Sequence, residues 1–293
     1  MQKKKARRKA MDFFFFVTPA FLLIFFSSLV PFLSNIYYSV MKWDGVNTPV
    51  FVGLRNYINL FTNDTRIIES FGFTLKYLVF TVILTNVIAL LIALLLDSKI
   101  KSKNALRTAF FLPNALSALI AGFMFSFIFS MGFSSLYDIT GWQIFNWSWL
   151  SDVKLAWISV GSVDVWRQMG YFMVIYIAGL QSVPQDVMES ARVDGANGWK
   201  TFWKITLPLL MPSITVCLFL SMSNALNVFD IPYALTGGGP GYSTTGMPLN
   251  IYKEAFENSM FGYASAKSLI YFVVVVVFSF MQLKATKSRE VEA

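Results

Sequence analysis

Six long apolar runs, separated by shorter polar segments, make up most of this chain. They cover residues 13–33, 73–96, 108–131, 155–180, 205–226 and 266–283. A helix needs about 20 apolar residues to cross the hydrocarbon core of a bilayer, and each run comes close to or exceeds that length. A helix also satisfies its backbone polar groups internally, as hydrocarbon requires. The pattern therefore predicts an all-α integral membrane protein with six transmembrane helices in one domain, residues 13–283.

The composition agrees with a membrane protein and changes how the charge is interpreted. Hydrophobic residues make up 56% of the 293 residues, and charged residues make up 14%, against about 25% in soluble domains. The net charge of +8 would suggest a nucleic-acid partner in a soluble protein, but here the bases flank the apolar runs. We therefore expect membrane lipid around the chain and no nucleic-acid partner.

The distribution of Lys and Arg predicts the orientation of the six helices. Sixteen of the 24 bases lie in the segments 1–12, 97–108, 185–204 and 284–293, and six lie in the segments on the opposite side. Basic residues concentrate on the cytoplasmic side of membrane proteins. Both ends are therefore predicted to be cytoplasmic (N-in, C-in), as a basic N-terminus (1–12) and a short C-terminal tail (284–293).

The side chains that most enzymes and metal sites use are scarce. The chain has no histidine and a single cysteine, Cys217, so we predict neither a metal site nor a disulfide within it. The segment Gly198-Trp199-Lys200-Thr201 lacks the adjacent Gly-Lys and the earlier glycine of a phosphate-binding loop. We expect no catalytic residue, no enzymatic activity and no cofactor in this chain.

Residues 185–204 form a polar island between the fourth and fifth apolar runs. The island holds three acids and three bases, and an ionised side chain in hydrocarbon costs roughly 3 kcal/mol or more, so the segment must leave the membrane. Gly195 can adopt a positive φ and end a helix. The island is therefore predicted to be a short helix, a glycine turn and a second helix that enters the membrane at Ile205.

The spacing within this island resembles the EAA loop of bacterial ABC importer permeases, in which Glu-Ala-Ala precedes a glycine and then Ile-x-Leu-Pro. The matching positions are Glu189, Ala191, Gly195, Ile205, Leu207 and Pro208, with Ser190 in place of the middle alanine. Residues 53–57, 107–113 and 235–240 resemble the "GLxNY", "R…F.LP" and "LTxGGP" elements of the carbohydrate, or maltose-transporter, type of these permeases. The resemblance therefore covers nearly the whole chain.

This resemblance implies a fold and a set of partners. The fold would be the transmembrane domain of a type I ABC importer in the bacterial cell membrane. The partners would be a second homologous permease, two ATPase subunits that hold ATP and Mg, and an extracellular or periplasmic solute-binding protein. The island would dock on an ATPase subunit, with Glu189 making a polar contact and Gly195 shaping the turn. The residues assigned to coupling are Glu189, Ala191, Asp194, Gly195, Ile205, Leu207 and Pro208.

Polar residues recur at three-residue steps near the end of the fifth run: Ser221, Asn224, Asn227 and Asp230. Polar residues in membrane helices usually face the bundle interior, and neutral amides and hydroxyls suit a polyhydroxylated ligand. In the sugar-transporting branch that the chain resembles, polar residues of this helix line the substrate path, so these four are assigned to it. The alternative is hydrogen bonding between helices, worth about 0.6 kcal/mol per contact. Weaker candidates are Asn86, Asn114 and Gln168, and Asp164 and Arg167 are predicted to pair.

The predicted function is the membrane-spanning subunit of a binding-protein-dependent ABC importer that moves a carbohydrate, an oligosaccharide or glycoside, by ATP-driven alternating access. One alternative is the same machine with a non-sugar cargo such as glycerol phosphate, a polyamine or a peptide. A phosphate would favour a cluster of Arg or Lys in the path, and only Arg167 lies deep in a run. The other alternative is an ion-coupled secondary carrier, which often shows internal repeats and buried ionisable relays.

Overall fold

The computed structural model describes residues 2–97 and 101–287, with side chains described from residue 13 onward. Parts of three predicted cytoplasmic segments therefore fall outside the described residues: residue 1, residues 98–100 and residues 288–293. The chain divides into two compact units, and each is described by itself. Unit 1 comprises Met1–Asn63 with Ile251–Tyr271, and unit 2 comprises Asp64–Asn250 with Phe272–Ala293.

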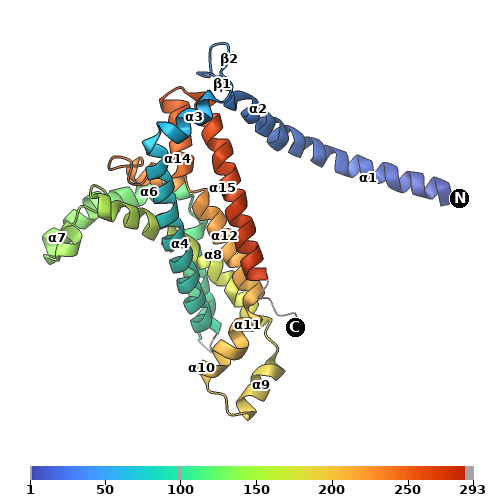
Figure 1. Cartoon of the computed structure of the whole chain (residues 1–293). Helices are drawn as coiled ribbons and strands as arrows, with labels where there is room; N and C mark the ends of the chain where they lie inside the picture. Colours follow the sequence, from blue (N-terminus) through green and yellow to red (C-terminus); the bar gives the residue numbers. More distant parts are fainter. Residues whose placement is uncertain (1, 98–100, 288–293) are drawn as a thin grey trace. The chain divides into compact units, whose positions relative to one another are not determined.

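Unit 1 begins with a long helical segment and ends at the first half of the last helix (Figure 1). Two short strands pair antiparallel in it, with Met41 opposite Phe51 and Lys42 opposite Val50. Its elements in chain order are α1 (Gln2–Ile24), η1 (Phe25–Leu29), α2 (Val30–Ser39), β1 (Met41–Lys42), β2 (Val50–Phe51), α3 (Arg55–Thr62), η6 (Lys253–Glu257) and the first part of α15 (Phe261–Lys287).

Unit 2 is built around three long helices, α4 (Thr65–Asp97), α8 (Val153–Gln181) and α12 (Met211–Leu226). The other elements are α5 (Lys103–Phe111), η2 (Leu112–Ala115), α6 (Ala118–Phe127), η3 (Ile128–Gly132), α7 (Phe133–Thr140), η4 (Gln143–Asn146), α9 (Gln185–Val193), α10 (Gly198–Thr201), η5 (Phe202–Thr206), α11 (Leu207–Leu209), α13 (Asp230–Thr236) and α14 (Met247–Tyr252), the last of which extends into unit 1. Figure 1 shows α9 and α10 projecting beyond the ends of α8 and α12.

Among the described residues, four helices are long and apolar enough to cross a membrane: Phe13–Ser39, Thr65–Asp97, Ala118–Thr140 and Phe261–Lys287. A fifth candidate is the pair Gly198–Leu209 and Met211–Leu226, which is bent by 67°. The 29-residue helix α8 is not in this set, since Asp164, Arg167 and Gln168 lower its average hydropathy. The chain is therefore a mostly helical membrane protein with four or five apolar spans among the described residues.

Two of the predicted spans have different shapes in the structure. The third run is interrupted at η2, because Pro113 lies in a tight turn there. Helical structure then continues through α7 to Thr140, beyond the predicted end of this run at residue 131. The fifth run is not straight, since the chain bends at Leu210. Pro212, two residues after the bend, has no N–H to donate to a preceding turn, which is a common cause of a helix break.

The core of unit 2 depends on small residues that let its helices approach closely. Ala89 and Ala93 of α4 are fully buried against a cluster that includes Phe172 and Tyr176 of α8 and Cys217 of α12. Without a hydrophobic driving force in lipid, close packing of this kind holds membrane helices together. The three helices consequently form a rigid frame for the polar residues described next.

Candidate functional site

The polar island folds into two short helical segments joined by a tight turn. Helix α9 carries Asp186 in its first turn and Arg192 in its last turn, the charge order that the helix dipole favours. Beyond the turn, the side chain of Asn197 caps α10 by accepting a hydrogen bond from the backbone N–H of Lys200 at 2.9 Å. The predicted order of short helix, glycine turn and second helix is confirmed.

Gly195 makes this turn with a φ of +72°. Its N–H donates to the Arg192 carbonyl at 3.1 Å, and the Ala196 N–H donates to the Ala191 carbonyl at 2.9 Å. These two bonds form the Schellman motif, which satisfies carbonyls that the helix end leaves open. A residue with a Cβ costs about 1–2 kcal/mol in this left-handed conformation, so glycine is the residue that fits.

The tip of the loop is polar and its inner side is anchored. Glu189 and Asp194 are exposed, whereas Ala191 is 6% exposed. The Thr206 hydroxyl donates to the Met188 sulfur at 3.9 Å, which ties α9 to the segment that leads into α12. The other residues assigned to coupling lie half-buried on that segment: Ile205, Leu207 and Pro208. The Thr206–Met188 contact therefore links α9 to the segment that leads into α12.

A cavity of about 450 Å³ lies between α8, α12 and the start of α13, next to the turn before α6. Amide and hydroxyl groups dominate its polar lining. The lining residues are Asn114, Ala118, Asp164, Arg167, Gln168, Tyr171, Leu220, Asn224, Asn227, Val228, Phe229, Asp230 and Ile231. This volume lies within the range of sites for small ligands, roughly 300–1,000 Å³.

One ion pair and one further carboxylate supply the charge in this cavity. Asp164 is 3% exposed and accepts hydrogen bonds from Arg167 Nη2 at 3.2 Å and from the Tyr77 hydroxyl at 2.5 Å. The predicted pairing of Asp164 with Arg167 is therefore confirmed. Asp230 at the start of α13 is exposed and adds a second negative charge. The charged lining therefore carries an excess of one negative charge.

The amides around the cavity use only part of their hydrogen-bonding capacity. Asn224 Nδ2 donates to Gln168 Oε1 at 2.7 Å, and Asn227 Nδ2 donates to the Ser223 carbonyl at 2.9 Å. Within the described part of the chain, the Oδ1 atoms of both asparagines and Nε2 of Gln168 make no hydrogen bond. These atoms can accept from, or donate to, the hydroxyls of a bound ligand.

The predicted polar stripe on the fifth run is not one helical stripe. Helix α12 ends at Leu226, Asn227 is its C-cap, and Asp230 begins α13. The change of direction nevertheless brings Asn224, Asn227 and Asp230 to the same cavity. Ser221 does not line this cavity.

Ser221 belongs instead to a buried network between the three long helices. It is 5% exposed and accepts a hydrogen bond from Asn86 Nδ2 at 2.9 Å. Asn86 Oδ1 in turn accepts from the Tyr176 hydroxyl at 2.7 Å. The contacts of Ser221 are thus those of interhelical packing, the alternative that the sequence leaves open.

Two tyrosines near the cavity are not among the predicted site residues. Tyr77, on α4, donates a hydrogen bond to Asp164 on α8. The two residues are 87 positions apart, so the spacing of residues along one helix could not predict this contact. Tyr171 lines the cavity three residues after Gln168, on the same face of α8. Its position three residues after the candidate Gln168 was the only feature of the sequence that could have placed Tyr171 at the cavity.

With the loop and the cavity described, similarity to known proteins identifies the family. Residues 86–287 match the model of a family described as the inner membrane component of binding-protein-dependent transport systems. The chain belongs to this family. It is an ABC transporter permease, and it is a multi-pass protein of the cell membrane. The matched range includes α9, the glycine turn and the whole cavity.

Curated relatives of this permease match over nearly their full length. A probable starch degradation products transport system permease protein, AmyD of Thermoanaerobacterium thermosulfurigenes, is 39% identical over 293 residues, 99% of each chain. A multiple sugar-binding transport system permease protein, MsmF of Streptococcus mutans, is 34% identical and covers 99% of this chain and 100% of its own.

A solved structure shares the fold of this permease. It is the structure of a bacterial ABC transporter involved in the import of the acidic polysaccharide alginate, and the TM-score is 0.83. The match covers 98% of this chain and 99% of that chain at 19% sequence identity. At this identity the likeness establishes the type I ABC importer fold alone.

Proposed function

We propose that this chain is the membrane-spanning subunit of a sugar importer, and that its cargo is an uncharged oligosaccharide or glycoside. The observation that carries the proposal is the cavity of unit 2, where Asn224, Asn227 and Gln168 hold unused amide atoms. A saccharide presents many hydroxyls that donate and accept at once, which suits such a lining. The names of the relatives, a starch-product permease and a multiple-sugar permease, support the same cargo class.

The charge of the cavity favours a neutral cargo over glycerol phosphate. Arg167 is already engaged by Asp164, and Asp230 leaves an excess of negative charge. A phosphate needs uncommitted cations within hydrogen-bonding distance, and this lining offers none beyond Arg167. A cationic polyamine remains compatible with one excess carboxylate, so it belongs in the test below.

The proposed topology has six spans with both ends in the cytoplasm. The spans are the four apolar helices, the bent pair that includes α12, and α8, whose polar residues are directed to the cavity. The excess of Lys and Arg on residues 1–12, 97–108, 185–204 and 284–293 supports this orientation. It gives a single permease domain over residues 13–283 with the polar island facing the cytoplasm.

The proposed energy source is a separate ATPase that holds ATP and Mg. In this arrangement α9 docks on the ATPase with Glu189 and Asp194 exposed at its tip, and Gly195 holds the loop in shape. The Thr206–Met188 contact and the half-buried Ile205, with the Leu207–Leu209 segment behind it, carry the motion to α12. A second homologous permease and an extracellular or periplasmic solute-binding protein complete the importer, which works by alternating access.

Uptake into proteoliposomes that contain the co-expressed complex tests this proposal. With binding protein outside and ATP inside, we expect uptake of one sugar class and none of glycerol phosphate or polyamine. Uptake that persists without ATP or without the ATPase would support an ion-coupled carrier instead. Uptake of only a non-sugar solute would overturn the assignment of the cargo.

A further inference from the structure

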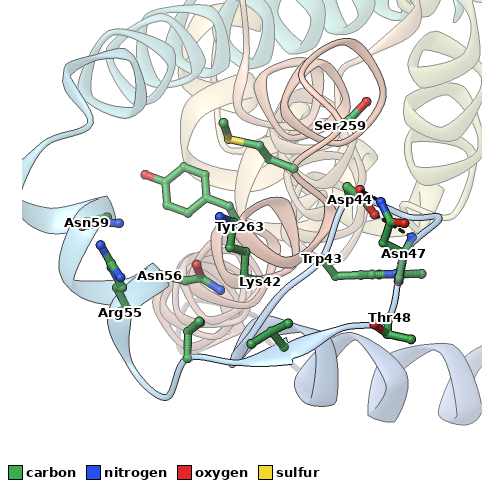
Figure 2. Close-up of a pocket in the computed structure, with 13 residues that line it drawn as sticks. Lys42, Trp43, Asp44, Asn47, Thr48, Arg55, Asn56, Asn59, Ser259 and Tyr263 are labelled. Atoms are coloured by element: carbon green, nitrogen blue, oxygen red, sulfur yellow. Dashed lines mark hydrogen bonds between the residues drawn. The ribbon is translucent and has the colours of Figure 1, made fainter.

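Unit 1 contains a second cavity, of about 560 Å³, which the functions above do not use. Figure 2 shows it between the β1–β2 loop, helix α3 and the start of α15. Its lining residues are Lys42, Trp43, Asp44, Asn47, Thr48, Val50, Val52, Arg55, Asn56, Asn59, Ser259, Met260 and Tyr263. In the proposed topology these residues all lie on the outer side of the membrane.

The walls of this outer pocket are held in place by buried polar contacts. Asn56 is 8% exposed, and its Nδ2 donates to the Ser39 and Met41 carbonyls at 2.8 and 2.9 Å. These two hydrogen bonds hold α3 against the end of α2, at Ser39, and the first residue of β1, Met41. A Cβ on Gly262 would overlap the Met41 carbonyl, so the start of α15 also packs directly on this strand. A pocket with such fixed walls loses little entropy on binding.

A buried ion pair supports the opposite wall. Lys267 is fully buried and donates to Glu254 at 2.6 Å. The same ammonium lies 4.8 Å from the centre of the Tyr263 ring, a cation–π distance. Tyr263 lines the pocket, so this contact fixes one of its two aromatic walls. The other, Trp43, is stacked on Tyr38 with ring centroids 4.2 Å apart.

The charges of the outer pocket are unbalanced in the positive direction. Asp44 is engaged by its own loop, since it accepts bonds from the backbone N–H of Val46 and of Asn47 and from Asn47 Nδ2. The exposed side chains of Lys42 and Arg55 make no ion pair and no hydrogen bond within the described residues. Two uncommitted cations beside apolar and aromatic walls suit a partner that carries a carboxylate next to an apolar side chain.

The cavity of unit 2 indicates that this partner is not the transported molecule. That cavity has an excess of one negative charge, whereas the outer pocket has an excess of one positive charge. The uncharged saccharide proposed above would leave both cations of the outer pocket, Lys42 and Arg55, without a counter-charge. We propose that the outer pocket receives an acidic loop of the extracellular solute-binding protein, in which an Asp or Glu side chain pairs with Arg55 and Lys42 and a neighbouring apolar side chain enters between Val52, Met260 and Tyr263. This inference rests on the proposed function, which supplies the binding protein.

The test uses the complete complex in lipid nanodiscs and the binding protein that stimulates its ATPase. The variants are Arg55→Glu, the double variant Lys42→Glu/Arg55→Glu, and Lys154→Glu as the matched control. Lys154 is an exposed base on the same proposed outer side, but it does not line the pocket. Arg55 and Lys42 are exposed as well, so the charge reversals should leave folding and basal ATPase activity unchanged.

We expect the affinity for the binding protein to fall at least tenfold in Arg55→Glu, to fall further in the double variant, and to change less than threefold in Lys154→Glu. The salt dependence of binding should become shallower in the two pocket variants, because an attractive charge pair is lost. Equal affinities in Arg55→Glu and Lys154→Glu would overturn the proposal. So would a variant that binds the sugar-free binding protein normally but no longer responds to sugar, since the occupant would then be the cargo.

Failure of the proposed function would give a different result. In that case the wild-type complex would show no stimulation by any sugar, whatever the pocket variants do. Docking of the binding protein to the wild-type complex can be measured without cargo, so the two claims are judged separately.

Discussion

Replacing Gly195 by alanine tests the coupling loop most sharply, because the structure predicts both the size and the origin of the effect. Gly195 has a φ of +72° at the end of α9, and a Cβ built on it meets no atom within 4 Å. The cost of alanine there is therefore backbone strain alone, about 1–2 kcal/mol. Gly198, three residues later, also has open space around its Cβ but no positive φ, so alanine should cost little there.

The strain should appear as weaker docking of the ATPase. In the proposed arrangement the ATPase binds the native turn, whereas the free loop of the variant can leave that turn and so relieve the strain. A penalty of about 1–2 kcal/mol then corresponds to a roughly 5- to 30-fold weaker association. The assay is the affinity of purified ATPase for the permease complex in nanodiscs, with Gly195→Ala compared directly with Gly198→Ala. The reasoning is refuted if the two variants bind the ATPase equally well.

Four further predictions follow from named contacts. Glu189→Lys should leave membrane insertion and thermal stability unchanged, because Glu189 is exposed. It should abolish ATP-coupled uptake into proteoliposomes, and normal uptake would contradict the proposed role of Glu189 in coupling. Asn224→Ala removes the bond to Gln168 and a free amide oxygen, and it should raise the KM for uptake about tenfold while basal ATPase stays intact; an unchanged KM would remove Asn224 from the substrate path. Asp164→Leu leaves the partly exposed Arg167 without its partner and the buried Tyr77 hydroxyl without its acceptor, so it should lower stability in detergent by about 1–3 kcal/mol, more than Tyr77→Phe does. Equal losses would show that the ion pair is unimportant. Hydrogen bonds from Asn47 and Val46 lower the pKa of Asp44 to about 2, so the stability that the Asp44 carboxylate gives the outer loop is fully present above its ordinary pKa and is lost only as the pH falls toward 2. The affinity for the binding protein should therefore not change with Asp44 titration from about pH 5 to 8, and a pH-dependent change in affinity that disappears in Asp44→Asn would contradict this.

Local features of the chain were the ones that the sequence predicted well. The charges of residues 185–204 predicted a loop outside the membrane, and Gly195 was the predicted turn residue because glycine readily adopts a left-handed conformation. The structure has a short helix in this segment and a positive φ at Gly195. Asp164 and Arg167 were expected to pair because they lie three residues apart on one helix, and they do. In each case the signal and the contact lie within a few residues of each other.

Features that depend on long-range packing could not be read from the sequence. Extending the helical period of the fifth run past Leu226 placed Asn227 and Asp230 on one continuous stripe. In the structure α12 ends at Leu226, and the chain changes direction before α13, which brings both residues to the same cavity. The partner of Asp164 on α4 and the partner of Ser221, Asn86, are 87 and 135 positions away. The outer pocket joins segments about 200 residues apart, so its unbalanced charge became visible only in the structure.

The most direct test of the central claim is the ATPase activity of the co-expressed complex in lipid, with the binding protein present, across a panel of sugars, glycerol phosphate and a polyamine. An importer of neutral saccharides predicts stimulation by one sugar class and by neither of the charged solutes. Stimulation by a charged solute alone would contradict the assigned cargo, and the absence of any co-purifying ATPase would contradict the coupling mechanism itself.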